Sequence, residues 1–130
     1  MDEGSEMIFG IGIDLIEVNR IERAMAKNSS FKTRMYSQAE IAYCDSVASS
    51  IQSYAARFAA KEAFMKALGT GWADEISWSE IEILREESGR PILNLLGRTR
   101  EIADTLGIQR SFVSLTHLKE YAAAVVTLEI

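Results

Sequence analysis

The stretch RFAAKEAFMKALGTG, residues 57–71, forms the centre of the predicted fold. Its alanines and other good helix formers predict a helix from about Ile51 to Leu68, which Gly69 ends as a left-handed cap. At about 100° per residue, Glu62 and Lys66 are neighbours on this helix and are flanked by alanines. Alanines permit the close approach of another element, so we expect the Glu62 end of this face to contact protein. The alternative is an exposed ion pair on the helix surface, worth roughly a few tenths of a kcal/mol.

The remaining elements are read from hydrophobic periodicity and turn signals on both sides of that helix. Ser37 and Glu40 form a capping box that begins a second helix, and Ser88-Gly89 is a hairpin signal. The order of strand, three helices, two strands, helix and two strands predicts an α+β domain with a mainly antiparallel sheet packed against the long helix. The other predicted elements are a strand at Met7–Leu15, helices at Val18–Lys27 and at about Ser37–Cys44, strands within 75–87 and 90–97, a helix at 98–107, and strands at 111–117 and 121–130.

Length and composition are those of one globular domain. The chain has 130 residues, 48% hydrophobic and 25% charged, and no apolar run approaches the ~20 residues of a membrane-spanning helix. Residues 1–6 are polar and acidic, lack the features of a secretion signal, and are expected to form a flexible tail before a single domain at 7–130. One cysteine, Cys44, excludes an internal disulfide and is expected to be a buried small side chain. We therefore expect a cytoplasmic protein without membrane association.

The charge is distributed unevenly along the chain. A net charge of −5 argues against general nucleic-acid binding. However, the segment from Arg20 to Arg34 holds five basic residues and one acidic residue. Arg20, Arg23 and Lys27 lie on one side of the predicted helix at 18–27, opposite its apolar side. This stripe indicates a docking surface for an acidic partner, although a solvated helix face would have the same pattern.

Two acidic residues stand in apolar surroundings. Asp14 lies inside the first strand, where an unpaired carboxylate is costly to bury, so a metal ion, a lysine or a helix N-terminus should face it. The simpler alternative is that Asp14 caps the following helix. Asp14 and Glu62 together could supply the one or two carboxylates that Mg²⁺ usually takes from a protein. Lys66 could then neutralise charge on a phosphate leaving group, and Arg57 and Lys61 could add phosphate contacts.

Other kinds of site find little support in the sequence. His117 is the only histidine and Cys44 the only cysteine, so a zinc site built from these residue types is excluded. A serine hydrolase would lack the G-x-S-x-G elbow. The glycines at 69–71 lack the following G-K-[ST] of a Walker phosphate loop.

Four blocks of the sequence resemble, in order and spacing, the signature blocks of the bacterial holo-acyl-carrier-protein synthases. They are GIGIDLIEVNRIER at 10–23, RFAAKEAFMKALGTG at 57–71, SGRPILNLLG at 88–97 and VSLTHLKEYAAAVV at 113–126. The resemblance extends from Ile8 to Glu129, and its combination of motifs is far more specific than any one of them. These synthases are small, single-domain members of the phosphopantetheinyl transferase superfamily. The resemblance therefore implies the α+β fold of that superfamily.

The resemblance also implies a reaction. An enzyme of this family moves the phosphopantetheine moiety of coenzyme A onto a serine of apo-acyl carrier protein and releases adenosine 3′,5′-bisphosphate. By position, Asp14 and Glu62 would ligate Mg²⁺, which also binds the coenzyme A pyrophosphate. Glu62 or a metal-bound water would accept the serine proton. Lys66 would steady the leaving phosphate.

Binding residues and assembly are implied in the same way. Family members are typically homotrimers with sites shared between neighbouring subunits. They dock the acidic carrier protein through the first helix, which would assign Arg20, Arg23 and Lys27 to docking. The residues implied to surround coenzyme A are Arg57, Lys61, Gly69, Thr70, Gly71, Arg90, Pro91, Thr116 and His117.

The chain departs from the family pattern at a few positions. Phe112 stands where many relatives have a histidine, Trp72 replaces the usual small aliphatic residue after G-T-G, and Leu118 replaces a residue that is often polar. None of these changes removes the acidic pair or Lys66. Two other functions remain open from the sequence: a non-catalytic subunit that binds coenzyme A, and a metal-dependent phosphohydrolase that uses the same two acids.

Overall fold

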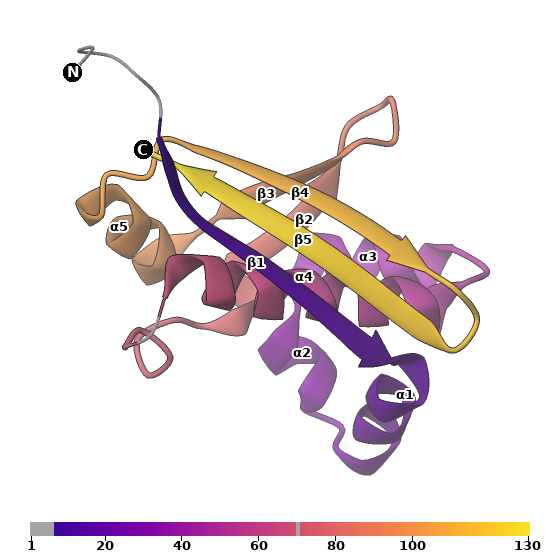
Figure 1. Cartoon of the computed structure of the whole chain (residues 1–130). Helices are drawn as coiled ribbons and strands as arrows, with labels where there is room; N and C mark the ends of the chain where they lie inside the picture. The colour runs from indigo at the N-terminus through magenta and orange to yellow at the C-terminus, as the bar shows by residue number, and fades with distance from the viewer. Residues whose placement is uncertain (1–6, 70) are drawn as a thin grey trace.

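The computed structural model describes residues 7–69 and 71–130, so the predicted tail at 1–6 and Thr70 lie outside the described residues. A three-stranded antiparallel sheet consists of β1 (Ile8–Glu17), β5 (Tyr121–Glu129) and β4 (Arg110–His117), in that spatial order. The helix α4 (Ser50–Leu68) packs across one face of this sheet (Figure 1). Within the described ranges, no helix is long and apolar enough to cross a membrane.

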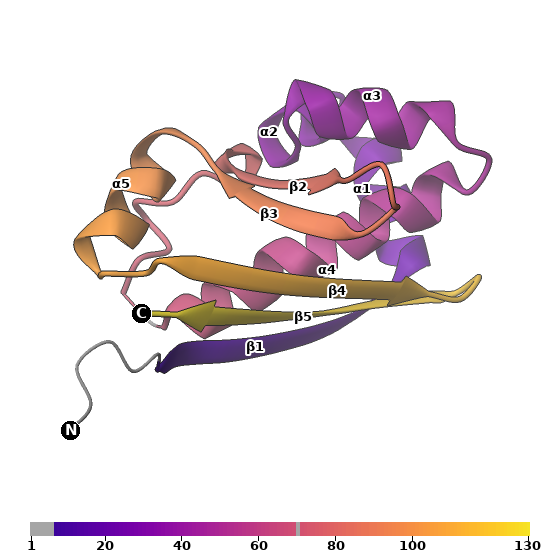
Figure 2. The same cartoon turned by 90° about the horizontal axis from the view of Figure 1, so that it is seen from above.

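The second half of the chain adds a hairpin and a short helix. The strands β2 (Ile81–Arg85) and β3 (Pro91–Leu95) pair with each other in a separate antiparallel sheet, where the sequence had predicted one main sheet. This hairpin lies beside the three-stranded sheet, since β3 packs near β4 and β2 contacts α4 (Figure 2). A 3₁₀ turn, η1 (Trp78–Glu80), precedes β2, and α5 (Gly97–Thr105) follows β3. The predicted α+β class is confirmed.

The helices at the other end of the sheet match the sequence with one omission. The helices α1 (Val18–Lys27) and α3 (Gln38–Ser46) lie where they were predicted. The capping box is confirmed: the Ser37 backbone N–H donates to Glu40 Oε1 at 2.9 Å, and the Glu40 N–H donates to Ser37 Oγ at 3.2 Å. The helix α2 (Phe31–Met35) was not predicted. Five residues are too few for a helical period to be recognised.

The long helix α4 is buried on nearly all sides in its central part. It contacts the three-stranded sheet on one side and α1, α3 and β2 on the others. Ala59, Ala60, Ala63 and Phe64 are completely inaccessible to solvent. Cys44, on the neighbouring α3, is also fully buried as predicted, and this burial raises the pKa of its thiol to about 11. Small side chains on α4 therefore let several elements approach the helix at once.

The tightest approach is between β1 and α4. A Cβ atom built at Gly12 would lie 1.8 Å from the carbonyl oxygen of Ala63, and one at Gly10 would lie 1.9 Å from that of Ala67. Both distances are far below van der Waals contact, so the two backbones touch directly at these positions. The sequence predicted that the alanines of α4 let another element come close, and the contact with β1 confirms this prediction.

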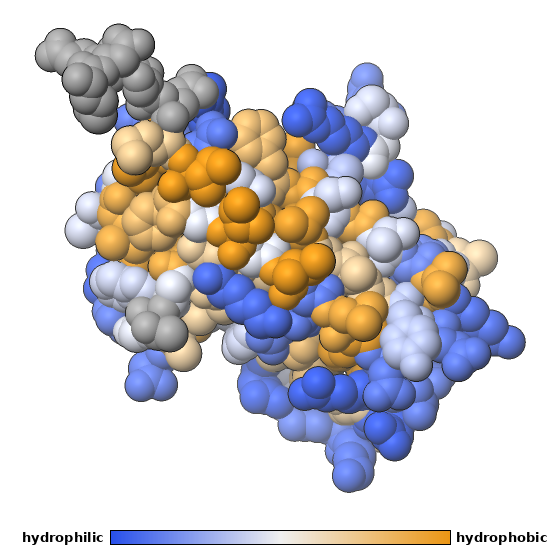
Figure 3. Space-filling view, in the orientation of Figure 1, coloured by the Kyte–Doolittle hydropathy of each residue, from blue (hydrophilic) through white to orange (hydrophobic). Residues whose placement is uncertain are grey.

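The outer face of the three-stranded sheet is apolar and exposed. Figure 3 shows hydrophobic side chains gathered over β1, β5 and β4 on this side of the molecule. Side chains on the two faces of a strand alternate, so inner residues such as Val126 fill the core while their neighbours point outward. The large exposed residues of this face are Ile11, Ile13, Leu15, Phe112, Tyr121 and Val125.

Adding one methyl group at Gly12 should destabilise the fold. Gly12→Ala places a carbon against the Ala63 carbonyl and forces β1 away from α4, so we expect a loss of about 1–3 kcal/mol or more in the free energy of unfolding. Urea denaturation followed by circular dichroism measures this loss. The control Ser29→Thr adds a methyl group at an exposed position in the turn after α1 and should have little effect. Equal stability of Gly12→Ala and the unaltered protein would show that strand and helix can separate at no cost.

Candidate active site

Asp14 lies on the inner face of β1 and is paired with a lysine from α4. Lys66 Nζ lies 3.2 Å from Asp14 Oδ1 and donates a second hydrogen bond of 3.0 Å to the carbonyl oxygen of Ile13. The side chain of Asp14 is only 17% exposed. The prediction that a positive group faces Asp14 is confirmed. The alternative that Asp14 caps α1 is wrong, because Glu17 occupies the N-cap position of that helix.

Glu62 completes a pair of carboxylates with Asp14. Burial, and then the negative charge of Asp14, raise the pKa of the half-buried Glu62 carboxyl above its usual value, while Lys66 and Arg20 act in the opposite direction. Two acids close enough to perturb each other repel unless a cation lies between or beside them. Lys66 supplies such a cation in this structure.

The donor set of this pair fits a hard divalent cation. Oxygen ligands are those that Mg²⁺ takes from proteins, usually one or two carboxylates with the other positions left to water and substrate. Among the described residues there is no group of three or more His, Cys, Asp or Glu residues that could hold a metal ion. Asp14 and Glu62 could therefore supply part of the shell of an Mg²⁺ ion, with water and a bound substrate in the remaining positions.

Four of the predicted coenzyme A residues meet in a cavity on the other side of α4. Its volume is about 380 Å³, and Arg57, Pro91, Thr116 and His117 line it. The β2–β3 hairpin contributes Arg85 and Gly89 to the same cavity, and α4 contributes Ser53 and Ala56. Arg85 was not predicted as a site residue, because it lies outside the four signature blocks and no local pattern distinguishes it from a solvated strand end.

The structure gives Lys61 a different environment from the one predicted. Its side chain is completely buried, and Nζ lies 2.7 Å from Glu40 Oε1 on α3. The same ammonium donates to the carbonyl oxygens of Trp78 and Ile81, which uses all three of its N–H groups. Lys61 thus joins α4 to α3 and to the start of β2, and it has no donor left for a coenzyme A phosphate.

Arg90, Gly69 and Gly71, which were also predicted to contact coenzyme A, are not among the residues that line this cavity. Arg90 is exposed in the β2–β3 turn. Gly69 and Gly71 both have positive φ, 101° and 97°, a conformation that side chains disfavour, and nothing lies near the position of an added Cβ. Gly69 has ψ 179°, so it ends α4 without the left-handed helical geometry that was predicted. Thr70 lies outside the described residues.

The basic stripe of α1 lies beside the carboxylate pair. Arg20, Arg23 and Lys27 are all exposed, while Val18 and Ile21 on the opposite side are buried. The charge of Arg20 acts on Glu62 and partly offsets the rise in the pKa of that carboxyl. The stripe is thus a positively charged surface that begins at the acidic pair.

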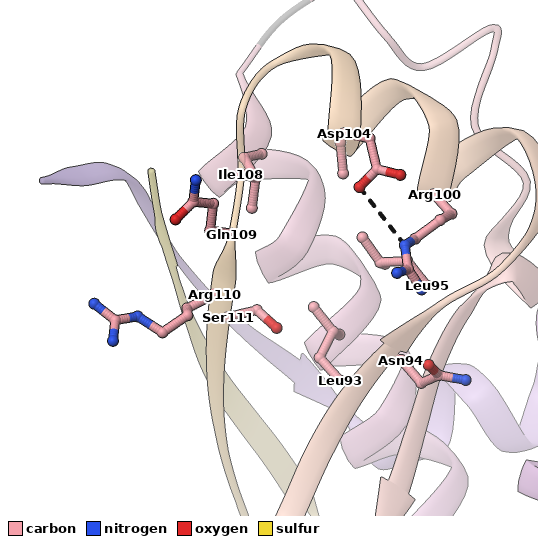
Figure 4. A pocket seen from close by; sticks show the side chains of 10 residues that line it. Leu93, Asn94, Leu95, Arg100, Asp104, Ile108, Gln109, Arg110 and Ser111 are labelled. Atoms are coloured by element: carbon pink, nitrogen blue, oxygen red, sulfur yellow. Dashed lines mark ion pairs between the residues drawn. The ribbon is translucent and has the colours of Figure 1, made fainter. Parts of the chain in front are cut away.

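A smaller cavity lies at the other end of β4 and contains none of the predicted site residues. Its volume is about 160 Å³, and it opens between β3, α5 and the start of β4 (Figure 4). Leu93, Leu95 and Ile108 line it together with Arg100, whose Nε lies 3.6 Å from Asp104 Oδ1. The predicted site residues therefore lie elsewhere, at the carboxylate pair and at the cavity of Arg57.

These two places lie toward opposite edges of the three-stranded sheet. Asp14 is on β1, whereas Thr116 and His117 are on β4, and β5 separates the two strands. Neighbouring strands lie about 4.8 Å apart, so β1 and β4 are about 10 Å apart. The carboxylate pair and the cavity of Arg57 are therefore two separate half-sites within one chain.

Comparison with known proteins assigns the fold to a family. A family model described as the 4′-phosphopantetheinyl transferase superfamily matches residues 10–126. A curated holo-[acyl-carrier-protein] synthase of Koribacter versatilis is 44% identical over 124 residues, which cover 95% of this chain and 99% of the relative. The chain belongs to the holo-acyl-carrier-protein synthase family. The resemblance seen in the four signature blocks is confirmed, and the chain is a transferase of the phosphopantetheinyl transferase superfamily.

Solved structures of holo-acyl-carrier-protein synthases share this architecture. The enzyme from Neisseria meningitidis superposes with a TM-score of 0.86 at 31% identity, covering 94% of this chain and 98% of that one. The enzyme from Bacillus anthracis, solved in complex with CoA (3′,5′-ADP), superposes with a TM-score of 0.78 at 38% identity, covering 95% and 97% of the two chains. The phosphopantetheinyl transferase fold implied by the sequence is confirmed.

The raised pKa of Glu62 predicts a stability gain on its neutralisation. A carboxyl whose pKa is higher in the folded state than in the unfolded state binds its proton more tightly when the protein is folded. Its contribution to stability is fully present below the unfolded-state pKa and is lost as the pH rises through the folded-state pKa. The metal-free Glu62→Gln variant should therefore melt at a higher temperature than the unaltered protein at about pH 8, with the difference shrinking toward about pH 4. Thermal denaturation in the presence of a chelator measures both. Glu22→Gln, at an exposed position of α1, is the control and should show no such pH dependence. A lower melting temperature of Glu62→Gln at high pH would mean that the attraction of Lys66 outweighs burial.

Proposed function

We propose that this protein transfers the 4′-phosphopantetheine moiety of coenzyme A to a serine of apo-acyl carrier protein, in the cytoplasm. The products are holo-acyl carrier protein and adenosine 3′,5′-bisphosphate. The observation that carries this proposal is the meeting of Asp14, Glu62 and Lys66 at the β1–α4 contact. The names of the relatives support the reaction, and the coenzyme A complex of the Bacillus anthracis enzyme supports the donor.

The acidic pair would hold Mg²⁺ with the coenzyme A pyrophosphate. When bound there, the ion neutralises charge that develops on the phosphate oxygens. Lys66 leaves Asp14 and contacts the departing phosphate, which is feasible because its side chain is 55% exposed. The serine oxygen forms a bond to the phosphorus that carries pantetheine, and the bond from that phosphorus to the bridging oxygen breaks. Glu62 accepts the serine proton.

The cavity on the other side of α4 would bind the nucleotide part of coenzyme A. Arg57, Thr116 and His117 provide N–H and O–H donors for phosphate and ribose oxygens, and Pro91 provides an apolar wall. We leave Lys61 out of this set, since its ammonium is fully used within the protein. Gly69, Thr70, Gly71 and Arg90 remain in the set through the family resemblance alone.

A homotrimer would join the two half-sites. The half-sites face opposite edges of one sheet, and the outer face of that sheet is apolar and exposed. Packing of this face against neighbours around a threefold axis would bring the β1 edge of one chain toward the β4 edge of the next. Each complete site would then lie between two subunits, with coenzyme A spanning them.

The basic stripe of α1 would dock the carrier protein. The charge of Arg20 acts on Glu62, and the exposed Arg23 and Lys27 continue the positive charge along α1 from that point, where the acceptor serine must arrive. An acidic partner would be steered to this position by long-range attraction.

Transfer should depend on the carboxylate pair and on a divalent cation. Asp14→Asn and Glu62→Gln should each lower the rate of phosphopantetheine transfer by about a hundredfold or more. Each change removes one of the two carboxylates that would hold the ion against the substrate phosphates. Mass spectrometry of purified apo-acyl carrier protein, incubated with coenzyme A and Mg²⁺, measures the added phosphopantetheine. Asp104→Asn, on the exposed side of α5, is the control.

The same assay separates the alternatives. Full transfer by both variants would remove the acidic pair from the mechanism. Binding of coenzyme A without transfer by the unaltered protein would indicate a non-catalytic subunit. Phosphate release without a carrier protein would indicate a phosphohydrolase.

The oligomeric state should depend on the outer face of the sheet. Leu15→Glu places a charge where Leu15 is now 68% exposed, and it should convert trimers to monomers because an unpaired charge is costly to bury in an apolar interface. Sedimentation velocity measures the change. Ile92→Glu, on β3, is the control and should leave the trimer intact. A monomeric unaltered protein that transfers at full rate would contradict the shared site.

Carrier-protein recognition should depend on the charge of α1. Arg23→Glu combined with Lys27→Glu should raise the KM for carrier protein by roughly tenfold or more, with a smaller change in kcat, since like charges now face an acidic partner. Arg20 is left unchanged because its charge reaches Glu62. Arg98→Glu combined with Arg100→Glu, two exposed arginines of α5, is the charge-matched control. If the double variant and the unaltered protein have the same KM for carrier protein at low and at high salt, α1 is excluded as the docking surface.

A further inference from the structure

Lys66 is the movable member of the group that it forms with Asp14 and Glu62. Its ammonium lies 3.2 Å from Asp14 Oδ1 and donates a hydrogen bond of 3.0 Å to the carbonyl oxygen of Ile13. These are its hydrogen bonds with the described residues, so one of its three N–H groups is left for solvent or a ligand. The side chain of Lys66 is 55% exposed, whereas that of Lys61 on the same helix is 0% exposed. Lys66 can therefore change partners without disturbing the core, and Lys61 cannot.

The two carboxylates, by contrast, stand on the backbone contact between β1 and α4. The main chains touch at Gly12 and Ala63, so the spacing of the two acids is set by the fold. The side chain of Asp14 is only 17% exposed, and its negative charge contributes to the raised pKa of Glu62. This fixed pair needs a cation beside it, and in the free protein Lys66 is the cation in contact with Asp14.

A divalent cation at Asp14 would compete with this ammonium. Hard cations such as Mg²⁺ and Mn²⁺ take carboxylate oxygens as ligands, and Asp14 Oδ1 already accepts a hydrogen bond from Lys66. An ammonium and a divalent ion on one carboxylate also repel each other. The ion therefore either displaces Lys66 or binds with reduced affinity. Phosphate oxygens nearby would favour the displaced lysine, because they accept its hydrogen bonds and neutralise its charge.

We propose that Lys66 is a built-in competitor of the divalent cation: its ammonium holds Asp14 in the free protein and keeps the affinity for the ion low, and the phosphates of coenzyme A draw it away. This inference rests on the proposed function, which places the pyrophosphate beside Asp14, Glu62 and Lys66. Coupling between two ligands is reciprocal, so the ion and coenzyme A each strengthen the binding of the other through the movement of one lysine. The acidic pair is thus neutralised in the free protein and opens to the ion when the substrate arrives.

Binding of Mn²⁺ to the protein without coenzyme A tests the competition. Electron paramagnetic resonance of the unbound ion gives the Kd. Lys66→Met keeps an unbranched side chain but removes the charge, and it should lower the Kd for Mn²⁺ by about three- to tenfold. Lys66→Arg keeps the charge, so its Kd should be no lower than that of the unaltered protein. Lys32→Met is the matched control and should leave the Kd unchanged, because Lys32 forms an ion pair of the same 3.2 Å with Asp45 elsewhere on the surface.

A second titration tests the release of Lys66 by coenzyme A. Isothermal titration gives the Kd of coenzyme A with a chelator and with saturating Mn²⁺, in the absence of carrier protein so that no transfer occurs. The ion should strengthen coenzyme A binding by a larger factor in the unaltered protein than in Lys66→Met, which has no lysine to release. The two factors should differ by about three- to tenfold, since the same competition is removed in both titrations.

The outcomes separate this inference from the proposed function. A purely structural role of Lys66 predicts an equal or weaker affinity of Lys66→Met for Mn²⁺, and that result would overturn the competition. Equal factors in the second titration would overturn the release by coenzyme A. Either result leaves the proposed function intact if the unaltered protein transfers phosphopantetheine to the carrier protein. Absence of transfer by the unaltered protein would overturn the proposed function and the release by coenzyme A together.

Discussion

The backbone contact between β1 and α4 is the constraint on which the rest of the structure depends. At Gly12 and Ala63 the main chains of the strand and the helix touch, because no side chain stands between them. This contact brings Asp14, the next inner-face residue of β1, to the helix face that carries Glu62 and Lys66. Any larger residue in the contact would move the two carboxylates apart, so the packing of small residues and the chemistry of the site cannot be varied independently.

The three cations of α4, Arg57, Lys61 and Lys66, differ in how completely the fold pairs them. Lys61 is fully paired by Glu40 and two backbone carbonyls, so this buried cation has no N–H group without a partner. Arg57 retains an unsatisfied donor, and Lys66 keeps an exposed side chain on Asp14. The helix therefore serves as a rigid support whose saturated lysine fixes its neighbours while its other cations face the half-sites.

Much of the local structure could be predicted because it depends on neighbours in the sequence. The capping box at Ser37, the long helix and both hairpins follow from periodicity and turn residues, and the acidic pair follows from polar residues in apolar surroundings. The helix α2 is too short to show a period, and η1 replaces the first part of a predicted strand. The helical wheel placed Lys61 correctly on α4 but could not show that Glu40 would lie against it.

The sequence by itself determined the family, the order of the longer elements and the small residues that let β1 meet α4. Only the tertiary structure decided that Lys61 is buried, that Arg85 joins Arg57 at Tyr43, and that the half-sites face opposite edges of one sheet. The physical reason is the range of the interactions. Helix and strand periods act over a few residues, whereas Lys61 and Glu40 are 21 positions apart and Arg85 and Tyr43 are 42 apart. Such pairs exist only once the elements have packed.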